Sequence, residues 1–273
     1  MIGGAHRLLR KTRQVPERLR TLQRYRAWRR PLGAIRWLLL DPETSNFTYE
    51  IANEDELVDF ITSALSVDRD RVARYVRELA EDTELHERLS ERLGQIPHAK
   101  RKPLFGRRAG WYAVVRATRP TLTVETGVHD GLGSAAILRA LERNAAEGFD
   151  GRLVSFDIDP DCGRILDDGL RERWTFVPTP TRSAFTDWVS ANDAPIEFFI
   201  HDSDHSFEHE SFELETFAPR FAPGAAVLTD NPGSRAFPEF CARLGLAHSA
   251  FWERPRRHFY PGAGIGLTVL PPR

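Results

Sequence analysis

Residues 124–134 read VETGVHDGLGS, and an alanine- and leucine-rich stretch, 135–146, follows them. The apolar residues before Glu125 predict a strand, and the pattern after Gly133 predicts a helix. Glycines between a strand and a helix let the backbone turn tightly and approach a ligand closely, with helix N–H groups facing it. The spacing E-x-G-x-x-x-G-x-G differs from the G-x-G-x-x-G of dinucleotide-binding proteins, which disfavours a nicotinamide-dependent enzyme. Glu125 suits a ligand with a cationic amino group; the alternative is a tight turn without a ligand.

A second acidic residue stands at the end of the next predicted strand, 152–157, which reads RLVSFD. A carboxylate at this position can accept the ribose hydroxyls of a nucleoside, and we assign that role to Asp157. Asp159 is instead predicted to cap a following helix, with Pro160 at its first position.

Strand-like and helix-like patterns alternate over the last two-thirds of the chain. We expect strands at 121–125, 152–157, 174–177, 196–201, 224–230, 246–252 and 264–270. We expect helices near 132–146, 160–171, 183–192, 206–221 and 235–244. This alternation predicts an α/β fold with a doubly wound, mostly parallel sheet. No helical pattern separates the last two strands, so one of them is predicted to run antiparallel.

The two motifs ETGVHDGLGS and SFDIDP resemble motifs I and II of the class I S-adenosylmethionine-dependent methyltransferases, and the similarity covers about residues 105–270. The resemblance implies a Rossmann-like, seven-stranded sheet. It also implies that Glu125 and Gly127 hold the methionine end of S-adenosylmethionine and that Asp157 binds its ribose. The full set of expected cofactor contacts is Glu125, Thr126, Gly127, Gly131, Ser134, Asp157, Ile158 and Asp202.

Acidic residues also follow the fourth and fifth predicted strands, which end in IHDSDHS (200–206) and LTDNPG (228–233). The carboxyl ends of parallel strands meet at one edge of a sheet, so these segments should face the glycine loop. Three oxygen ligands, from Asp202, Asp230 and Asn231, suit Mg²⁺ or Mn²⁺ better than zinc. A bound cation would stabilise an alkoxide, and His205 is the candidate base that deprotonates the hydroxyl.

Structural roles are the alternative for the same residues. Asp-Asn-Pro-Gly is a strong turn signal, and Asp204 or Ser206 could cap the next helix. His201, His205 and His209 recur every four residues; the first lies in a strand and the last in a helix, so they need not converge.

The DSDH and DN segments resemble metal-dependent small-molecule O-methyltransferases, above all the sugar O-methyltransferases of macrolide biosynthesis. This resemblance implies that Asp202 and His205 are catalytic and that Asp230 and Asn231 complete the metal site. Catechol-type enzymes carry a lysine near the position of His205, so a plant-phenol acceptor is disfavoured.

The N-terminal third differs from the rest in charge. Residues 1–37 hold eleven basic residues and one acidic residue, a balance of +10, whereas the remainder has 27 basic and 38 acidic residues, a balance of −11. We expect a basic amphipathic arm (1–40), a helical segment (41–97) in which Asn53 and Glu56 form a capping box, and the catalytic domain (98–273).

The arm suggests three roles: packing on an acidic surface, weak association with anionic lipid, or nucleic-acid binding. We do not expect nucleic-acid binding, since the catalytic domain is acidic and has no recognition motif. A homo-oligomer is left open. Two cysteines without CxxC spacing and the lack of a long apolar run or signal peptide suit a cytoplasmic protein, peripheral to the inner face of the membrane if the arm binds lipid.

Two further segments have two interpretations each. Arg107, Arg108, Trp111 and Tyr112 either cover the cofactor or, in the case of Trp111, pack in the core. The segment 253–262 mixes arginine, histidine and aromatic residues, and we favour a solvated hairpin over a carbohydrate- or phosphate-binding loop.

The sequence thus predicts an O-methyltransferase that acts on a small-molecule, sugar or glycolipid hydroxyl with a divalent cation and a histidine base. The alternatives are a metal-independent methyltransferase and a non-catalytic relative that only binds the cofactor.

Overall fold

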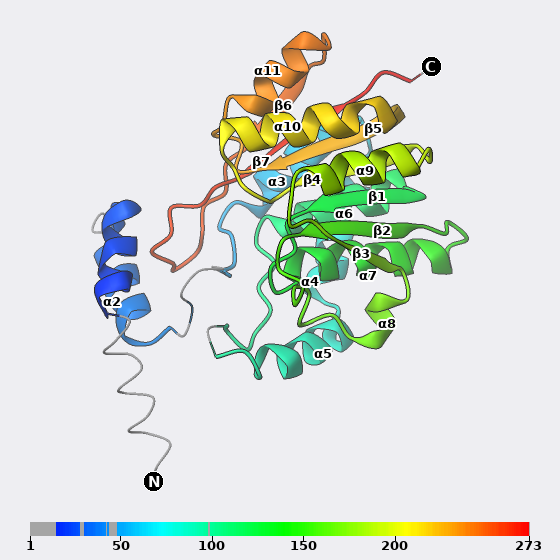
Figure 1. Cartoon of the computed structure of the whole chain (residues 1–273). Coiled ribbons are helices and arrows are strands. Elements are labelled where there is room, and N and C mark those ends of the chain that lie inside the picture. Colours follow the sequence, from blue (N-terminus) through cyan, green and yellow to red (C-terminus); the bar gives the residue numbers. More distant parts are fainter. Residues whose placement is uncertain (1–14, 28–29, 42, 44–47, 98, 273) are drawn as a thin grey trace.

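The computed structural model describes residues 15–27, 30–41, 43, 48–97 and 99–272. Its centre is a seven-stranded sheet with the order β3-β2-β1-β4-β5-β7-β6 (Figure 1). The strands are β1 (Leu122–Thr126), β2 (Arg152–Asp157), β3 (Trp174–Pro178), β4 (Ile196–His201), β5 (Phe221–Asp230), β6 (His248–Phe251) and β7 (Ile265–Val269). Only β7 runs antiparallel to its two neighbours, β5 and β6. This confirms the predicted Rossmann-like, mostly parallel sheet.

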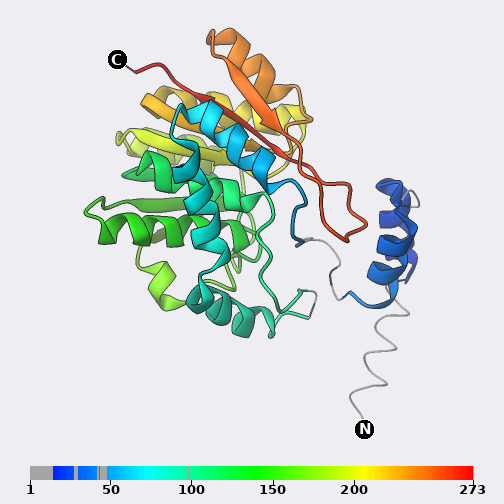
Figure 2. The same cartoon turned by 180° about the vertical axis from the view of Figure 1, so that it is seen from behind.

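The central strands are apolar on both faces because helices cover both sides of the sheet. In β4, Phe198 and Ile200 face one hydrophobic cluster, and Phe199, between them, faces the other. One layer contains α6 (Arg108–Thr118) and α7 (Leu132–Ala146), with α3 (Glu54–Leu65), α4 (Arg69–Ala80) and α5 (Thr83–Leu93) sharing the same core. The other contains α9 (Ser183–Ala191), α10 (Phe207–Phe217) and α11 (Ala236–Arg243) (Figures 1 and 2).

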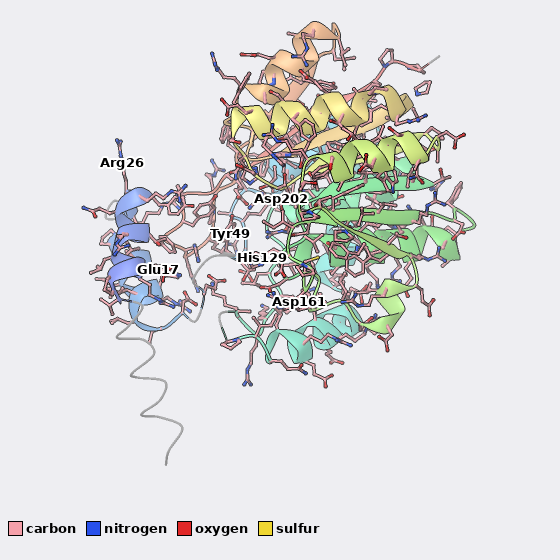
Figure 3. All side chains as sticks on the ribbon, viewed as in Figure 1. Glu17, Arg26, Tyr49, His129, Asp161 and Asp202 are labelled. Atoms are coloured by element: carbon pink, nitrogen blue, oxygen red, sulfur yellow. The ribbon has the colours of Figure 1, made fainter. Side chains whose placement is uncertain are left out.

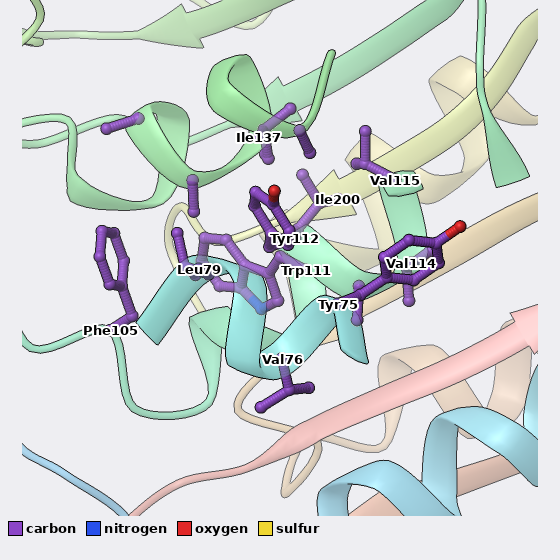
Figure 4. Close-up of a cluster of buried hydrophobic side chains, with 14 of the residues drawn as sticks. Tyr75, Val76, Leu79, Phe105, Trp111, Tyr112, Val114, Val115, Ile137 and Ile200 are labelled. Atoms are coloured by element: carbon purple, nitrogen blue, oxygen red, sulfur yellow. The ribbon is translucent and has the colours of Figure 1, made fainter. Parts of the chain in front are cut away.

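Helix α6 is absent from the sequence prediction, and it lies at the centre of the first layer. Eight of its eleven residues are buried, so the segment has no polar face to give a helical period. Trp111 is fully buried and packs against α7: a Cβ at Gly133 would lie 2.2 Å from its ring. Trp111 is therefore a core residue, surrounded by side chains such as Leu79 and Val76 (Figure 4).

The expected helix over 160–171 is largely wrong, because only α8 (Asp168–Arg171) forms. Gly163 has φ +67° and its N–H donates to the carbonyl of His129, while Ile165 N–H donates to that of Asp130. Two of the backbone N–H groups that a helix would use internally thus donate to the glycine loop. Asp159 caps no helix; it accepts from the N–H of Asp161 within a turn.

The predicted capping box at Asn53 is also wrong. The side chain of Asn53 makes no capping hydrogen bond; its Nδ2 donates to Glu56 and its Oδ1 accepts from the N–H of Arg254. The C-terminal segment therefore takes the acceptor that a capping box would use.

The arm consists, in its described part, of a helical stretch at 15–24 and helix α2 (Pro31–Leu39). It lies beside the loop between β6 and β7 at one side of the molecule (Figures 1 and 2). Arg18 joins the two helical stretches by donating to the carbonyls of Trp37 and Asp41, each at 2.7 Å. The part of the predicted arm at 1–14 lies outside the described residues. No helix in the described ranges is both long and apolar enough to cross a bilayer.

Candidate active site

The carboxyl ends of β1, β2, β4 and β5 open into one cavity of about 670 Å³. Asp202 and His129 lie at these strand ends, on the side of the sheet that faces the arm. Tyr49 lies between the strand ends and the arm (Figure 3). Most of the predicted site residues line the cavity: Glu125, Gly127, Asp157, Ile158, Asp202, His205, Asp230 and Asn231. Thr126, Gly131 and Ser134 do not line it; they lie at the end of β1, before α7 and within α7, respectively. The two halves of the cavity differ in their chemistry.

In the first half, Glu125 is a buried carboxyl group with one oxygen in use. Its Oε2 accepts from the hydroxyls of Ser134 and Ser155, each at 2.7 Å. Its Oε1 is buried without a hydrogen-bond partner in the described structure. Burial raises the pKa of Glu125 to about 7, against the two serine hydroxyls, which lower it. Ser134 thus positions Glu125, and the orphaned Oε1 can accept from a ligand's amino group.

Asp157 holds the glycine loop in shape. Its Oδ2 accepts from the backbone N–H groups of Val128 and His129, at 2.7 and 3.0 Å, and its Oδ1 accepts from that of Asp159. A carboxylate has about four lone-pair positions, so one remains for a ligand hydroxyl. The loop also depends on Gly127, which has φ +86° and no room for a side chain, since a Cβ would lie 2.1 Å from the carbonyl oxygen of Asp202.

In the second half, side chains of types that can bind a metal ion come together. Ligand atoms of Asp202, His205 and Asp230 all lie within 4.8 Å of one another. Burial beside Asp230 raises the pKa of Asp202 well above its usual value. Desolvation lowers the pKa of His205, so its imidazole is neutral at neutral pH. The Nε2 of His205 lies 3.7 Å from Oδ1 of Asp202, too long for a hydrogen bond but close enough to stabilise a cationic ring.

Arg107 forms a bidentate ion pair with Asp230. Its Nε and Nη2 donate to the two carboxylate oxygens, at 2.5 and 2.6 Å, and its Nη1 donates to Glu253 and to the hydroxyl of Tyr49, each at 3.0 Å. Burial would raise the pKa of Asp230, but this guanidinium holds it below its usual value. The sequence had suggested Arg107 as a cover for the cofactor; it lies among the acids instead.

A second network that the sequence did not predict supports β4. Glu213 is fully buried; its Oε2 is 2.6 Å from His201 Nδ1 and accepts from Thr126, and its Oε1 is 2.8 Å from His209 Nε2. Burial would raise the pKa of Glu213, but these hydrogen bonds lower it to about 2. His201 and His209 therefore do converge, on a carboxylate, and the ring of His201 lies 5.4 Å from that of His205.

Two segments far apart in the sequence, 49–52 and 253–260, close the far wall of the cavity. The backbone N–H of Ala52 donates to Arg254, and that of Arg256 donates to Glu50. Tyr49 donates to Glu253 at 2.7 Å. In this loop His258 and Phe259 are buried, so the favoured interpretation of 253–262 as a solvated hairpin is wrong. The wall facing the acids is aromatic and consists of Tyr25, Tyr49 and Tyr260.

Comparisons with known proteins agree with this arrangement. Residues 124–231 match a family model described as a methyltransferase domain. A solved methyltransferase from Geobacter sulfurreducens is 21% identical, covers 75% of this chain and 97% of its own, and superposes with a TM-score of 0.50. A Klebsiella pneumoniae protein described as a candidate O-methyltransferase is 16% identical, covers 79% and 96%, and also has a TM-score of 0.50. The curated proteins contain no match. The resemblance to class I S-adenosylmethionine-dependent methyltransferases is confirmed.

Proposed function

We propose that this chain, which carries a class I methyltransferase domain, transfers a methyl group from S-adenosylmethionine to the hydroxyl of a small molecule, sugar or glycolipid. The observation that carries the proposal is the division of one cavity into two halves. Glu125 and Asp157 flank the glycine loop and form what we call the cofactor half, and Asp202, His205 and Asp230, whose ligand atoms lie within 4.8 Å of one another, form the acceptor half.

The residues of the first half fit the cofactor. The orphaned Oε1 of Glu125 would accept from the amino group of the methionine part, and the remaining lone pair of Asp157 would accept from a ribose hydroxyl. Ile158 is 78% exposed beside them, and its apolar side chain suits contact with a flat base. When bound, S-adenosylmethionine supplies the methyl group as an electrophile.

His205 is the proposed base of the second half. A hydroxyl is a weak nucleophile until it loses its proton, and a neutral imidazole can take that proton. We assign the proton taken from the hydroxyl to Nε2 of His205, which lies 3.7 Å from Oδ1 of Asp202, because an ionised Asp202 would stabilise the imidazolium that forms. Asp202 therefore has a supporting role in the same step.

The fit of a divalent cation is the next question. Asp202, Asp230 and Asn231 are of the right chemical type, and the first two come together with His205. However, both carboxylate oxygens of Asp230 already accept from Arg107, and a fixed positive charge there opposes a second cation. We therefore propose the metal-independent form of the reaction, in which Arg107 balances the charge of the acids. Assistance by Mg²⁺ or Mn²⁺ stays a prediction from the sequence.

Calorimetry with S-adenosylmethionine and S-adenosylhomocysteine, first with Mg²⁺ and then with EDTA, tests the core of the proposal. Micromolar binding in both conditions would support it, and the absence of binding in both would overturn it. Turnover on a library of hydroxylated sugars then separates an enzyme from a protein that only binds the cofactor, and turnover that survives EDTA supports the metal-independent form.

A further inference from the structure

The inner face of the arm belongs to the wall of the cavity. Trp37 packs on Phe259 with ring centroids 4.3 Å apart, and Tyr25 packs edge-on against Tyr260 at 5.1 Å. Helix α2 approaches the loop between β6 and β7 so closely that a Cβ at Gly33 would lie 3.1 Å from the backbone of His258 and Phe259. Because Tyr25 and Tyr260 both line the cavity, the arm and the acceptor half of the site form one structure.

The outer face of the arm is apolar and, within the described structure, exposed. Leu32, Ile35 and Leu39 recur at helical spacing and are 84%, 51% and 59% exposed, so they form one stripe along α2. Six large apolar side chains of the arm are exposed: Val15, Leu19, Leu32, Ile35, Leu39 and Leu40. Elsewhere in the described structure such residues are scattered singly over the catalytic domain. A concentration of this kind marks an interaction surface.

The arm that carries this stripe is positively charged. The described arm has one acidic residue, Glu17, and its exposed cations are Arg20, Arg24, Arg26, Arg30 and Arg36. Arg26 extends from the end of the arm in Figure 3. Two basic arms would repel each other, and the acidic body of another copy offers few apolar groups to cover the stripe. An anionic lipid surface satisfies both the apolar and the charged groups.

We infer that the outer face of the arm docks the protein on an anionic membrane surface. The docking brings the acceptor end of the cavity, which Tyr25 lines from the inner face of the arm, within one helix diameter (~10 Å) of the lipid surface. The acceptor would then be a membrane-borne hydroxyl, such as a glycolipid head group. This last step rests on the proposed function, whereas the docking itself does not.

The test is flotation of the full chain with vesicles of pure phosphatidylcholine and of equimolar phosphatidylcholine and phosphatidylglycerol. We expect binding to the anionic vesicles that the double variant Leu32→Glu/Ile35→Glu reduces at least tenfold. The matched control is Phe149→Glu/Leu244→Glu, which makes the same change at two exposed apolar residues of the catalytic domain and should bind as the wild type does. Replacing Arg20 or Arg26 with glutamine should weaken binding about fivefold for each arginine.

Equal binding of the wild type and the arm variant, or no binding to anionic vesicles, would overturn the inference. A dimer in light scattering that the arm variant dissociates, without an effect of lipid, would assign the stripe to a second copy instead. Vesicle binding is measured without cofactor, so it can succeed while methyl transfer fails. Conversely, turnover of a water-soluble acceptor by a protein that ignores vesicles would leave the proposed function intact.

Discussion

Arg107 and Asp230 form a bidentate ion pair in which the guanidinium reaches both carboxylate oxygens, at 2.5 and 2.6 Å, and both side chains are almost completely buried. The pair joins the start of α6 to the end of β5. In the proposed metal-independent reaction, this pair supplies the positive charge beside the acids at the end of the sheet.

Arg107→Gln should therefore have two effects. Removing one partner leaves Asp230 buried and unpaired, which should lower the free energy of unfolding by about 3–5 kcal/mol, as measured by urea denaturation. The variant should also bind Mg²⁺ or Mn²⁺ more tightly than the wild type in calorimetry. The double variant Arg107→Gln/Asp230→Asn should recover part of the stability. Strong Mg²⁺ binding by the wild type would contradict the metal-independent proposal.

His205→Ala should reduce turnover by about two to four orders of magnitude and leave the affinity for S-adenosylmethionine unchanged, because a base acts only on the acceptor's proton. Since desolvation lowers the pKa of His205, wild-type turnover at saturating S-adenosylmethionine should stay constant near neutral pH and fall only in more acidic buffer. His248→Ala, at an exposed histidine, is the control. A His205→Ala enzyme with normal turnover would remove this residue from the mechanism.

Cofactor affinity should depend on pH through Glu125. Its pKa is about 7 in the folded protein, and a cationic amino group binds the carboxylate, so affinity should rise as the pH rises through 7 and then level off. Binding near pH 6 should release a proton, which calorimetry in buffers of different ionisation enthalpy measures. Glu125→Gln should bind weakly at every pH. A pH-independent affinity would contradict this role.

The same group affects stability in the opposite direction. Because burial raises the pKa of Glu125 from 4.5, its favourable contribution is fully present below 4.5 and is lost as the pH rises through about 7. Glu125→Gln should therefore be at least as stable as the wild type at pH 8, as measured by urea denaturation, even though it loses cofactor affinity. A large loss of stability at that pH would assign Glu125 to the fold instead of to the ligand.

Gly127→Ala should disrupt the glycine loop. Both Gly127 and Gly148 have positive φ, a conformation that costs alanine about 1–2 kcal/mol, but only Gly127 also lacks space. Gly148→Ala should therefore lose only the stability that this strained conformation costs, and it should bind the cofactor normally. Gly127→Ala should lose more stability and most of its affinity, because the backbone of Asp202 must move.

Glu213→Gln should lower the free energy of unfolding by about 3 kcal/mol, since it breaks a buried network with two histidines and a threonine. The pKa of Glu213 is about 2, below its ordinary 4.5, so its stabilisation is present above 4.5 and is lost as the pH falls through 2. Glu215→Gln, at an exposed neighbour on the same helix, should change stability by less than about 0.5 kcal/mol. Equal effects of the two variants would show that the network contributes little.

The sequence predicted the strands and the glycine loop because the pattern that indicates each of them lies within a short stretch of sequence. Strands buried on both faces read as short apolar runs, and the residues that shape the loop lie between 124 and 157. Helix α6 could not be read in the same way, because burial on nearly all sides removes the helical period. The helix prediction for 160–167 failed for another reason: the backbone of this segment donates hydrogen bonds to the glycine loop, and no local sequence pattern indicates such a contact.

The acceptor half was the least predictable part of the site. Arg107 and Asp230 are separated by 123 positions, and Tyr49 and Glu253 by 204. Charged residues at such separations look like ordinary surface groups until the fold brings them together. The division of the chain at 40 and 97 stays a prediction; α3 and α4 share their core with α6, beyond the second boundary.

The pairing of residues 50–52 with 254–256 also bears on how the protein is made. The ribosome completes the glycine loop and its supporting strands well before residues 253–260 emerge. Until then, Tyr49 and Arg107 lack Glu253, and closing such a long loop is a slow, late event. We expect a nascent chain to acquire its nucleoside-binding half first and to become selective for its acceptor only after residues 253–260 have emerged.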